Sequence, residues 1–177
     1  GGQPNCTIQY SDGYIYTGFW NSETKDANFV CVSATDEDPD NPTETKYATW
    51  TYAVQGGFYW AGAYVTDKYA IVGSDDGESD STSDSSYVYC FDKLTGEVVQ
   101  KVGPHHGDIR SDISYYDGRI YFTSKGGYLY SYNLKEDGTI DTENLIEPIE
   151  IGKMSTSTPA IANGRCYVGS SYGSNFS

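Results

Sequence analysis

The sequence predicts an all-β fold, a β-propeller of which about three and a half four-stranded antiparallel blades are present. Three observations lead to this prediction: the residue composition, a turn signal that recurs along the chain, and short apolar runs around each turn. The 177 residues include 18 Tyr, 20 Gly and one Met. Such a composition favours many short strands joined by tight turns over long helices.

A turn dipeptide recurs every 46 to 55 residues, which suits the period of a propeller blade. Its four copies are Asp12-Gly13, Asp67-Lys68, Asp117-Gly118 and Asn163-Gly164. Asp-Gly or Asn-Gly between apolar runs predicts a hairpin with a type I′ turn, because that turn needs positive φ at both central residues. The second copy departs from this pattern at its lysine.

Each complete repeat contains four apolar-rich runs, and we assign one strand to each. First and second strands flank the turn, at 7–11 and 14–18, 62–66 and 69–73, 112–116 and 119–123, and 158–162 and 165–169. Third strands follow at 28–33, 87–92 and 128–133, and fourth strands at 45–53, 97–103 and 147–152. We expect one partial propeller domain, 1–177, with blades at approximately 5–54, 55–103 and 104–152 and an incomplete blade at 153–177.

The fourth repeat has two strands, and the sequence ends where the loop to its third strand should begin. Natural folds avoid leaving such a sheet edge unpaired. We therefore expect a partner for this edge. It is either the remainder of the propeller, on further sequence, or a second copy of the chain, in which case two times three and a half blades give a seven-bladed ring.

The charge and the hydrophobic pattern of the sequence argue against two classes of partner, nucleic acid and the membrane interior. Asp and Glu number 25 against 11 Lys and Arg, for a formal charge of −14. A nucleic-acid partner is not expected, because phosphate binding needs a basic surface. Membrane insertion is not expected either, because no apolar stretch approaches the length of a span. We expect a secreted or cell-surface bacterial protein, with export as an inference, since no signal region opens the sequence.

Four cysteines in an exported chain would suggest two disulfides. The repeat alignment favours another interpretation, because each cysteine falls on a strand position that is small or apolar in the other copies. Cys6, Cys31, Cys90 and Cys166 are therefore predicted to be buried free thiols, which behave as compact hydrophobic side chains. Structural disulfides remain the alternative.

Two motifs carry a resemblance to a known family. Asp92, Thr95 and Gly96 have the spacing of the docking motif A-x-D-x-x-T-G-x-x-x-W, and residues 157–170 match a first-and-second-strand hairpin. On these residues the chain resembles the pyrroloquinoline-quinone (PQQ) repeat family of β-propellers, the quinoprotein alcohol dehydrogenase-like superfamily. The resemblance implies that 92–96 form the turn between the third and fourth strands, with the Asp as its cap and the Gly at positive φ. Gln100 stands where the family has Trp, and Trp50 is the candidate docking aromatic of the first blade.

The resembled family includes enzymes, envelope assembly factors and non-catalytic surface modules, so the fold does not fix the function. Its quinone dehydrogenases bind their cofactor with calcium inside an eight-bladed ring and usually have adjacent cysteines. This sequence has no adjacent cysteines, so PQQ is not expected. We expect a non-catalytic extracellular module for protein or carbohydrate binding or scaffolding. The alternatives are an enzyme whose site is completed by missing blades and an envelope protein-assembly scaffold.

Candidate binding residues lie in loops that a propeller gathers on one face. Loops between second and third strands, at 20–28 and 75–86, are longer than the one at 124–127, and long loops on a rigid scaffold favour binding. The connections between blades share that face and carry the candidates Phe58, Tyr59, Trp60, His105, His106, Asp108 and Arg110. Aromatic rings beside charged groups could stack on a sugar or hold a peptide. The alternative is that Phe58 and Trp60 fill the core between blades.

Metal sites receive weak support from the sequence. No third ligand is spaced to join the His pair, so a solvated loop is expected there. Asp36, Asp38 and Asp40 imitate the first half of a calcium loop, yet Asn41 and Tyr47 stand where Gly and Glu are needed. These aspartates are weak calcium candidates, and calcium is the one cofactor considered possible. The acidic run at 75–84 is likewise expected to be a solvated loop.

Overall fold

The computed structural model of the chain describes residues 2–172 and 175–176, and this part contains strands and no helix. The first sheet comprises β1 (Gln9–Ser11), β2 (Tyr14–Gly18), β3 (Asp26–Ser33) and β4 (Ala48–Gln55), hydrogen-bonded in chain order. The second comprises β5 (Tyr64–Val65), β6 (Tyr69–Gly73), β7 (Ser86–Asp92) and β8 (Val98–His105), also in chain order. All pairings in both sheets are antiparallel.

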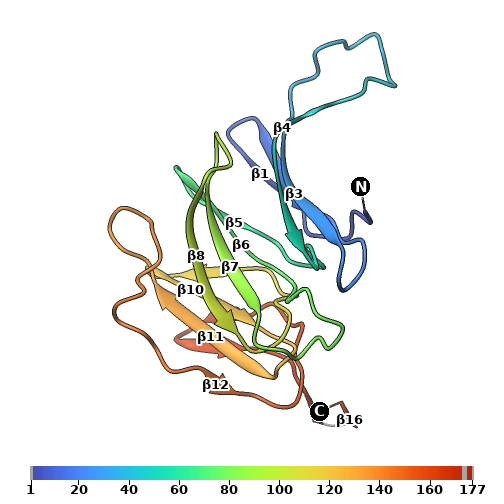
Figure 1. Ribbon diagram of the computed structural model, residues 1–177. Helices are drawn as coiled ribbons and strands as arrows, with labels where there is room; N and C mark the ends of the chain where they lie inside the picture. The colour runs from blue at the N-terminus through green and yellow to red at the C-terminus, as the bar shows by residue number, and fades with distance from the viewer. Residues whose placement is uncertain (1, 173–174, 177) are drawn as a thin grey trace.

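The third sheet repeats this arrangement with β9 (Ser114–Tyr116), β10 (Arg119–Thr123), β11 (Tyr128–Asn133) and β12 (Ile149–Glu150). Two antiparallel hairpins follow, β13 (Ala160–Ala162) with β14 (Arg165–Tyr167), and β15 (Ser171–Tyr172) with β16 (Asn175–Phe176). Figure 1 shows the three sheets succeeding one another from blue through green to orange, as propeller blades do. The all-β, partial-propeller prediction is therefore confirmed. The described residues hold no helix that could cross a membrane.

The hairpin turns have the backbone that their dipeptides predict. Asp12, Asp117 and Asn163 have φ of 49°, 47° and 51°, and the glycine after each also has positive φ. This is the type I′ geometry. The second blade uses a different turn, in which Thr66 Oγ1 accepts hydrogen bonds from the amides of Lys68 and Tyr69 at 3.2 and 2.9 Å. The Thr66 hydroxyl therefore stabilises this turn, which lacks the glycine of the other three copies.

Neighbouring blades pack through apolar side chains from their facing surfaces. Between the first two blades, the Phe29 and Phe91 rings are parallel within 5°, with centroids 5.8 Å apart. Between the second and third, Ile71, Ile109 and Phe122 are completely buried. All four cysteines are free thiols, and Cys6, Cys31 and Cys90 are buried, as predicted.

Cys166 corrects that prediction, because it is exposed. It lies on β14, and its strand register matches Ala70 and Ile120, which are buried, and Ile15, which is partly buried. In the described residues, the β13–β14 hairpin has no following four-stranded sheet packed on it. Ala70 and Ile120 pack against the preceding blade from complete four-stranded sheets, whereas β13 and β14 form a two-stranded sheet in the described residues.

One backbone hydrogen bond recurs between successive blades on the loop face. The amides of Phe58, Ile109 and Ser155 donate to the carbonyls of Phe19, Ser74 and Ser124 at 2.9, 3.1 and 3.1 Å. A second bond recurs inside each blade, from the amides of Trp20, Asp75, Lys125 and Ser171 to the carbonyls of Gln3, Gly57, Asp108 and Met154. These bonds fix the connections between blades against the loops between second and third strands, so both kinds of loop share one face, as predicted.

The β7–β8 turn docks against the preceding blade. Asp92 Oδ1 accepts hydrogen bonds from the amides of Leu94 and Thr95 at 3.0 and 2.9 Å. Gly96 has φ of 75°, and a Cβ placed on it would lie 2.5 Å from the Trp50 ring. Trp50 Nε1 donates to the Lys93 carbonyl at 2.9 Å. Trp50 is therefore the docking aromatic of the first blade.

Gln100 occupies the corresponding position of the second blade, since Gln100 pairs with Cys90 as Trp50 pairs with Cys31. Its amide group forms two hydrogen bonds with the backbone of Ile140, donating from Nε2 at 2.9 Å and accepting at Oε1 at 2.7 Å. Two polar contacts thus replace ring stacking at this junction.

Candidate functional site

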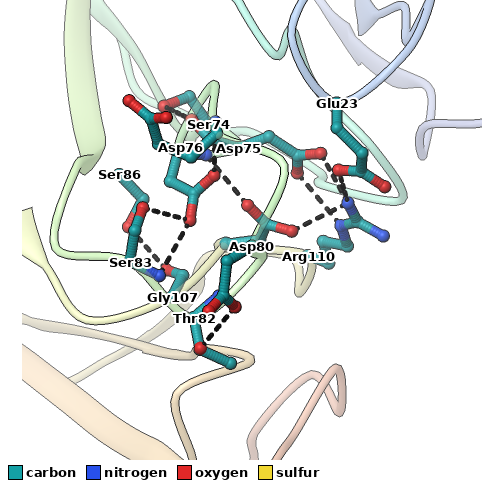
Figure 2. A network of polar contacts seen from close by, with 12 residues as sticks. Glu23, Ser74, Asp75, Asp76, Asp80, Thr82, Ser83, Ser86, Gly107 and Arg110 are labelled. Carbon is teal, nitrogen blue, oxygen red and sulfur yellow. Dashed lines mark hydrogen bonds and ion pairs between the residues drawn. The ribbon is translucent and has the colours of Figure 1, made fainter.

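A buried ion cluster lies where the loops of three blades meet. Arg110 Nη2 lies 2.7 Å from Asp75 Oδ2, 2.7 Å from Asp108 Oδ2 and 2.8 Å from Glu23 Oε2. Arg110 Nε also donates to Asp75 Oδ1 at 3.1 Å, so that carboxylate is held by two bonds. Figure 2 shows the guanidinium between Glu23 and Asp75. The cluster therefore ties together the β2–β3, β6–β7 and β8–β9 connections.

The β6–β7 loop folds back on itself around Asp76 instead of extending into solvent. Asp76 Oδ2 accepts hydrogen bonds from the amide and hydroxyl of Ser83 at 3.2 and 2.7 Å (Figure 2). Asp76 Oδ1 accepts a hydrogen bond from the Glu78 amide. The Asp76 amide donates to Asp108 Oδ1 at 2.9 Å. The expectation of a solvated acidic loop is wrong for its first two residues, because Asp75 is 1% and Asp76 7% exposed. Local donors compensate the buried carboxylates.

Burial dominates the titration of the cluster. It raises the pKa of Asp75 to about 8, and repulsion from Asp108 adds to this against the opposing attraction of Arg110. Burial also raises the pKa of Asp108 to about 7, again against Arg110. Burial disfavours the charged guanidinium, but Asp75, Asp108 and Glu23 outweigh it and raise the Arg110 pKa. With these pKa values Asp75 is mostly and Asp108 partly protonated at pH 7, so the cluster carries little excess negative charge.

The same three carboxylates form the group of potential metal ligands found in the described residues, with oxygens within 4.8 Å of one another. Oxygen ligands at this spacing suit a hard cation such as calcium. However, Arg110 Nη2 is within hydrogen-bond distance of all three. The guanidinium takes the place that a metal ion would need.

An aromatic stack adjoins the cluster. The Arg110 guanidinium carbon lies 4.5 Å from the centroid of the Tyr59 ring. Tyr59 also packs against Trp20, with centroids 4.9 Å apart, and against Trp60, with centroids 4.3 Å apart and planes inclined by 20°. The repeating backbone bonds place Tyr59 and Arg110 at corresponding positions of successive blades. Each reaches back to the preceding blade, Tyr59 to Trp20 and Arg110 to Asp75.

Trp60 is the extra residue of this connection. Phe58 corresponds to Ile109, and Ala61 corresponds to Ser111. Two residues separate Phe58 from Ala61, but only one separates Ile109 from Ser111. Trp60 adopts φ of 56° and is 48% exposed. Positive φ is a strained conformation for a bulky residue, and such strain gathers at functional sites. Trp60 therefore stands out on the loop face and does not fill the core.

Phe58 lies away from that surface. It is completely buried, packs against Phe29 with centroids 5.3 Å apart, and accepts a hydrogen bond at its carbonyl from Cys6 Sγ. Phe58 thus follows the core-filling alternative, while its neighbours Tyr59 and Trp60 do not.

The two histidines point apart. His105, at the end of β8, is 2% exposed, its Nε2 lies 2.8 Å from the Tyr132 hydroxyl, and burial lowers its pKa to about 4. The expected solvated loop is therefore wrong for His105, because β8 extends far enough to insert the ring among Phe122 and Tyr130. His106 is partly exposed and its Nδ1 lies 2.6 Å from Asp84 Oδ1.

Asp36, Asp38 and Asp40 are exposed on the β3–β4 loop, which projects from the body of the molecule in Figure 1. They are not among the three carboxylates that come close together in the described residues.

Sequence reasoning selected Tyr59, Trp60, Asp108 and Arg110 but missed three residues that contact them: Trp20, Glu23 and Asp75. The signal that could have found them is the repeat register, because Trp20 and Asp75 occupy one loop position in successive blades. Glu23 carries no such signal, since it lies in a loop that differs in length from blade to blade.

No protein-family model matches the chain, and no curated protein matches it. Solved structures do. BamB from Moraxella catarrhalis superposes with a TM-score of 0.61 at 13% identity, covering 94% of this chain and 44% of BamB. The computationally designed Ika8 protein gives 0.60 at 9% identity, over 90% of this chain and 40% of Ika8. A europium-containing methanol dehydrogenase gives 0.51 at 12% identity, over 79% and 24%.

This chain spans less than half the length of each of these three proteins. At such low identity the likenesses show the fold and nothing of the activity. They support the β-propeller that the PQQ-repeat resemblance implies.

Proposed function

We propose that this chain is a non-catalytic β-propeller module that binds a protein or carbohydrate ligand through its loop face. The observation that carries the proposal is Trp60, a half-exposed ring held at positive φ and supported from behind by Tyr59. Exposed aromatic side chains with ordered support are typical anchors of binding surfaces.

The support beneath Trp60 is rigid. Tyr59 is enclosed by Trp20, Trp60 and Arg110, and Arg110 is fixed in turn by carboxylates from three blades. A ring that is already ordered loses little conformational entropy when a ligand covers it. We extend the proposal to an extracellular or cell-surface location, without a resident cofactor.

One observation favours an enzyme as the second candidate. Buried carboxylates with raised pKa values, such as Asp75 and Asp108, often mark catalytic sites. Both are completely or almost completely buried and paired with Arg110, so a substrate reaching them would have to displace the guanidinium. We therefore prefer a structural role for this pair within a binding module. An envelope assembly scaffold would use the same loop face for a protein partner.

The test is a binding screen of the purified chain against glycan and peptide arrays, repeated with Trp60→Ala. We expect at least one class of ligand whose signal falls roughly tenfold in the variant, as loss of an aromatic anchor predicts. Tyr116→Ala is the matched control, because Tyr116 is 47% exposed but lies on the β9–β10 hairpin, at the opposite end of the strands. Binding that is unchanged by Trp60→Ala would remove the proposed site.

A further inference from the structure

The Trp60 ring is the exposed end of an aromatic stack whose next ring, Tyr59, contacts Arg110 of the ion cluster. Tyr59 cannot receive a ligand, because Trp20, Trp60 and Arg110 all pack on it. Trp60 has Tyr59 on one side and is 48% exposed. A ligand at this position therefore meets an aromatic ring, and the polar groups around the stack decide which chemistry it can have.

Most of the polar groups beside the stack are already used. Both oxygens of Asp75 contact Arg110, and Asp108 Oδ1 accepts a hydrogen bond from the Asp76 amide. Two atoms here have no hydrogen-bond partner among the described residues, Asp108 Oδ2 and Trp20 Nε1, and both are buried out of reach of a ligand. Neutral sugars are recognised through several directed hydrogen bonds to side chains lining the site. Side chains that hydrogen-bond one another are not free to make those bonds, so this surface is poorly suited to a neutral sugar.

The surface does offer negative charge. Residues 75–84 contain five acidic and no basic residues, and three of them, Glu78, Asp80 and Asp84, are exposed. The Glu23 side chain is 37% exposed, and one of its carboxylate oxygens lies 2.8 Å from Arg110 Nη2. An acidic surface attracts cations over several ångströms, and an indole face binds them by cation–π attraction.

We propose that Trp60 receives a cationic side chain, lysine or arginine, from a basic peptide segment, with Glu23 as the accessible counter-charge. This inference rests on the proposed function and names the ligand class of the same site. Charge complementarity with a chain of formal charge −14 favours this occupant over an acidic or neutral one.

The experiment is a fluorescence-anisotropy titration of the chain into a labelled, acetylated hexalysine peptide, with hexaglutamine and a neutral oligosaccharide as comparison probes. We expect hexalysine to bind and hexaglutamine not to bind. Trp60→Ala should weaken hexalysine binding about tenfold, and Glu23→Gln should weaken it by a smaller factor. Trp60→Gly should behave as Trp60→Ala, and it keeps the fold because glycine accepts positive φ without strain.

Two substitutions at the opposite end of the strands serve as controls. Tyr116→Ala removes an aromatic ring of similar exposure, and Glu136→Gln removes an exposed charge on the β11–β12 connection. Both should leave hexalysine binding unchanged. Hexalysine binding that does not respond to Trp60→Ala or Trp60→Gly would be general attraction to an acidic protein and would overturn the inference.

The remaining outcomes separate the inference from the proposed function. Trp60-dependent binding of the oligosaccharide without hexalysine binding would overturn the basic-peptide assignment and leave the binding module standing. If no probe and no array ligand depended on Trp60, both proposals would be wrong.

Discussion

Arg110 is 5% exposed and neutralises part of the charge of three carboxylates that come from three different blades. Removing one partner of a buried ion pair leaves a charge without compensation, at a cost of about 3–5 kcal/mol. We predict that Arg110→Met lowers the free energy of unfolding by about 3 kcal/mol at pH 8, as measured by urea denaturation. At pH 5 the loss should be smaller, because Asp75 and Asp108 are then protonated in the folded state. An equal loss at both pH values would contradict this account.

The same residues show what local sequence can and cannot reveal. Asp108 and Arg110 could be selected because a short connection between blades carries both charges. Glu23 could not, since it lies 87 residues from Arg110 in a loop of variable length. Asp75 lies 35 residues from Arg110, and only the repeat register points to it. The sequence did not decide whether Trp60 lies in the core or on the surface. That Trp60 is an extra residue of its connection is seen only when the backbone hydrogen bonds define the register.

At the scale of elements, the β7–β8 turn and the β9–β10 hairpin offer a matched pair of glycines. Gly96 and Gly118 have φ of 75° and 78°, but a Cβ on Gly96 would meet the Trp50 ring at 2.5 Å, whereas one on Gly118 would meet nothing within 4 Å. We predict that Gly118→Ala costs about 1 kcal/mol, the cost of left-handed backbone, and that Gly96→Ala costs about 1–3 kcal/mol more through overpacking.

Thermal and urea unfolding of the two variants measures the difference. Equal destabilisation would show that the docking turn is not tightly packed against Trp50.

The strands themselves were largely predictable, and their ends were not. The Asp-Gly and Asn-Gly turns located the second strand of the first, third and fourth repeats, because type I′ turns tolerate few other dipeptides. The end of β8 was placed at 103 but lies at His105, which brings a histidine into the core that its loop-like sequence did not indicate. The burial of Asp75 and Asp76 was also missed. The composition of an acidic run does not show whether hydrogen-bond donors from other segments surround its carboxylates in the folded chain.

At the scale of the whole molecule, the buried titratable groups make stability depend on pH. Burial raises the pKa of Asp75 and Asp108 above the ordinary 3.8, so the folded state holds protons that the unfolded chain has released. The stability from these groups is complete below about pH 4 and is lost as pH rises through their folded pKa values. His105 acts in the opposite direction, since its lowered pKa removes stability as pH falls from about 6.5 towards 4.

Above pH 6.5 the histidine contribution is constant, which isolates the carboxylates. We predict that the free energy of unfolding falls between pH 6.5 and 8.5 with a slope of about 1–2 kcal/mol per pH unit. Asp75→Asn should flatten this slope, because the amide keeps an acceptor oxygen for Arg110 but does not titrate. Urea unfolding of both proteins at several pH values measures the two slopes. A slope unaffected by Asp75→Asn would contradict the assignment of the pH dependence to this carboxyl.

The recurring amide bonds of the loop face also bear on how this scaffold could be altered. In the second blade, the loop between β6 and β7 runs through twelve residues from Asp75 to Ser86. In the third blade, the corresponding loop is the short turn at 124–127. Both loops are closed by the same bond, from the Ser74 and Ser124 amides to the Tyr87 and Tyr128 carbonyls. The intervening length can therefore vary at a modest cost in chain entropy. A foreign segment inserted after the exposed Ser79 would keep this closing bond and also Ser83, which hydrogen-bonds the buried Asp76, so this position suits the grafting of a new recognition sequence.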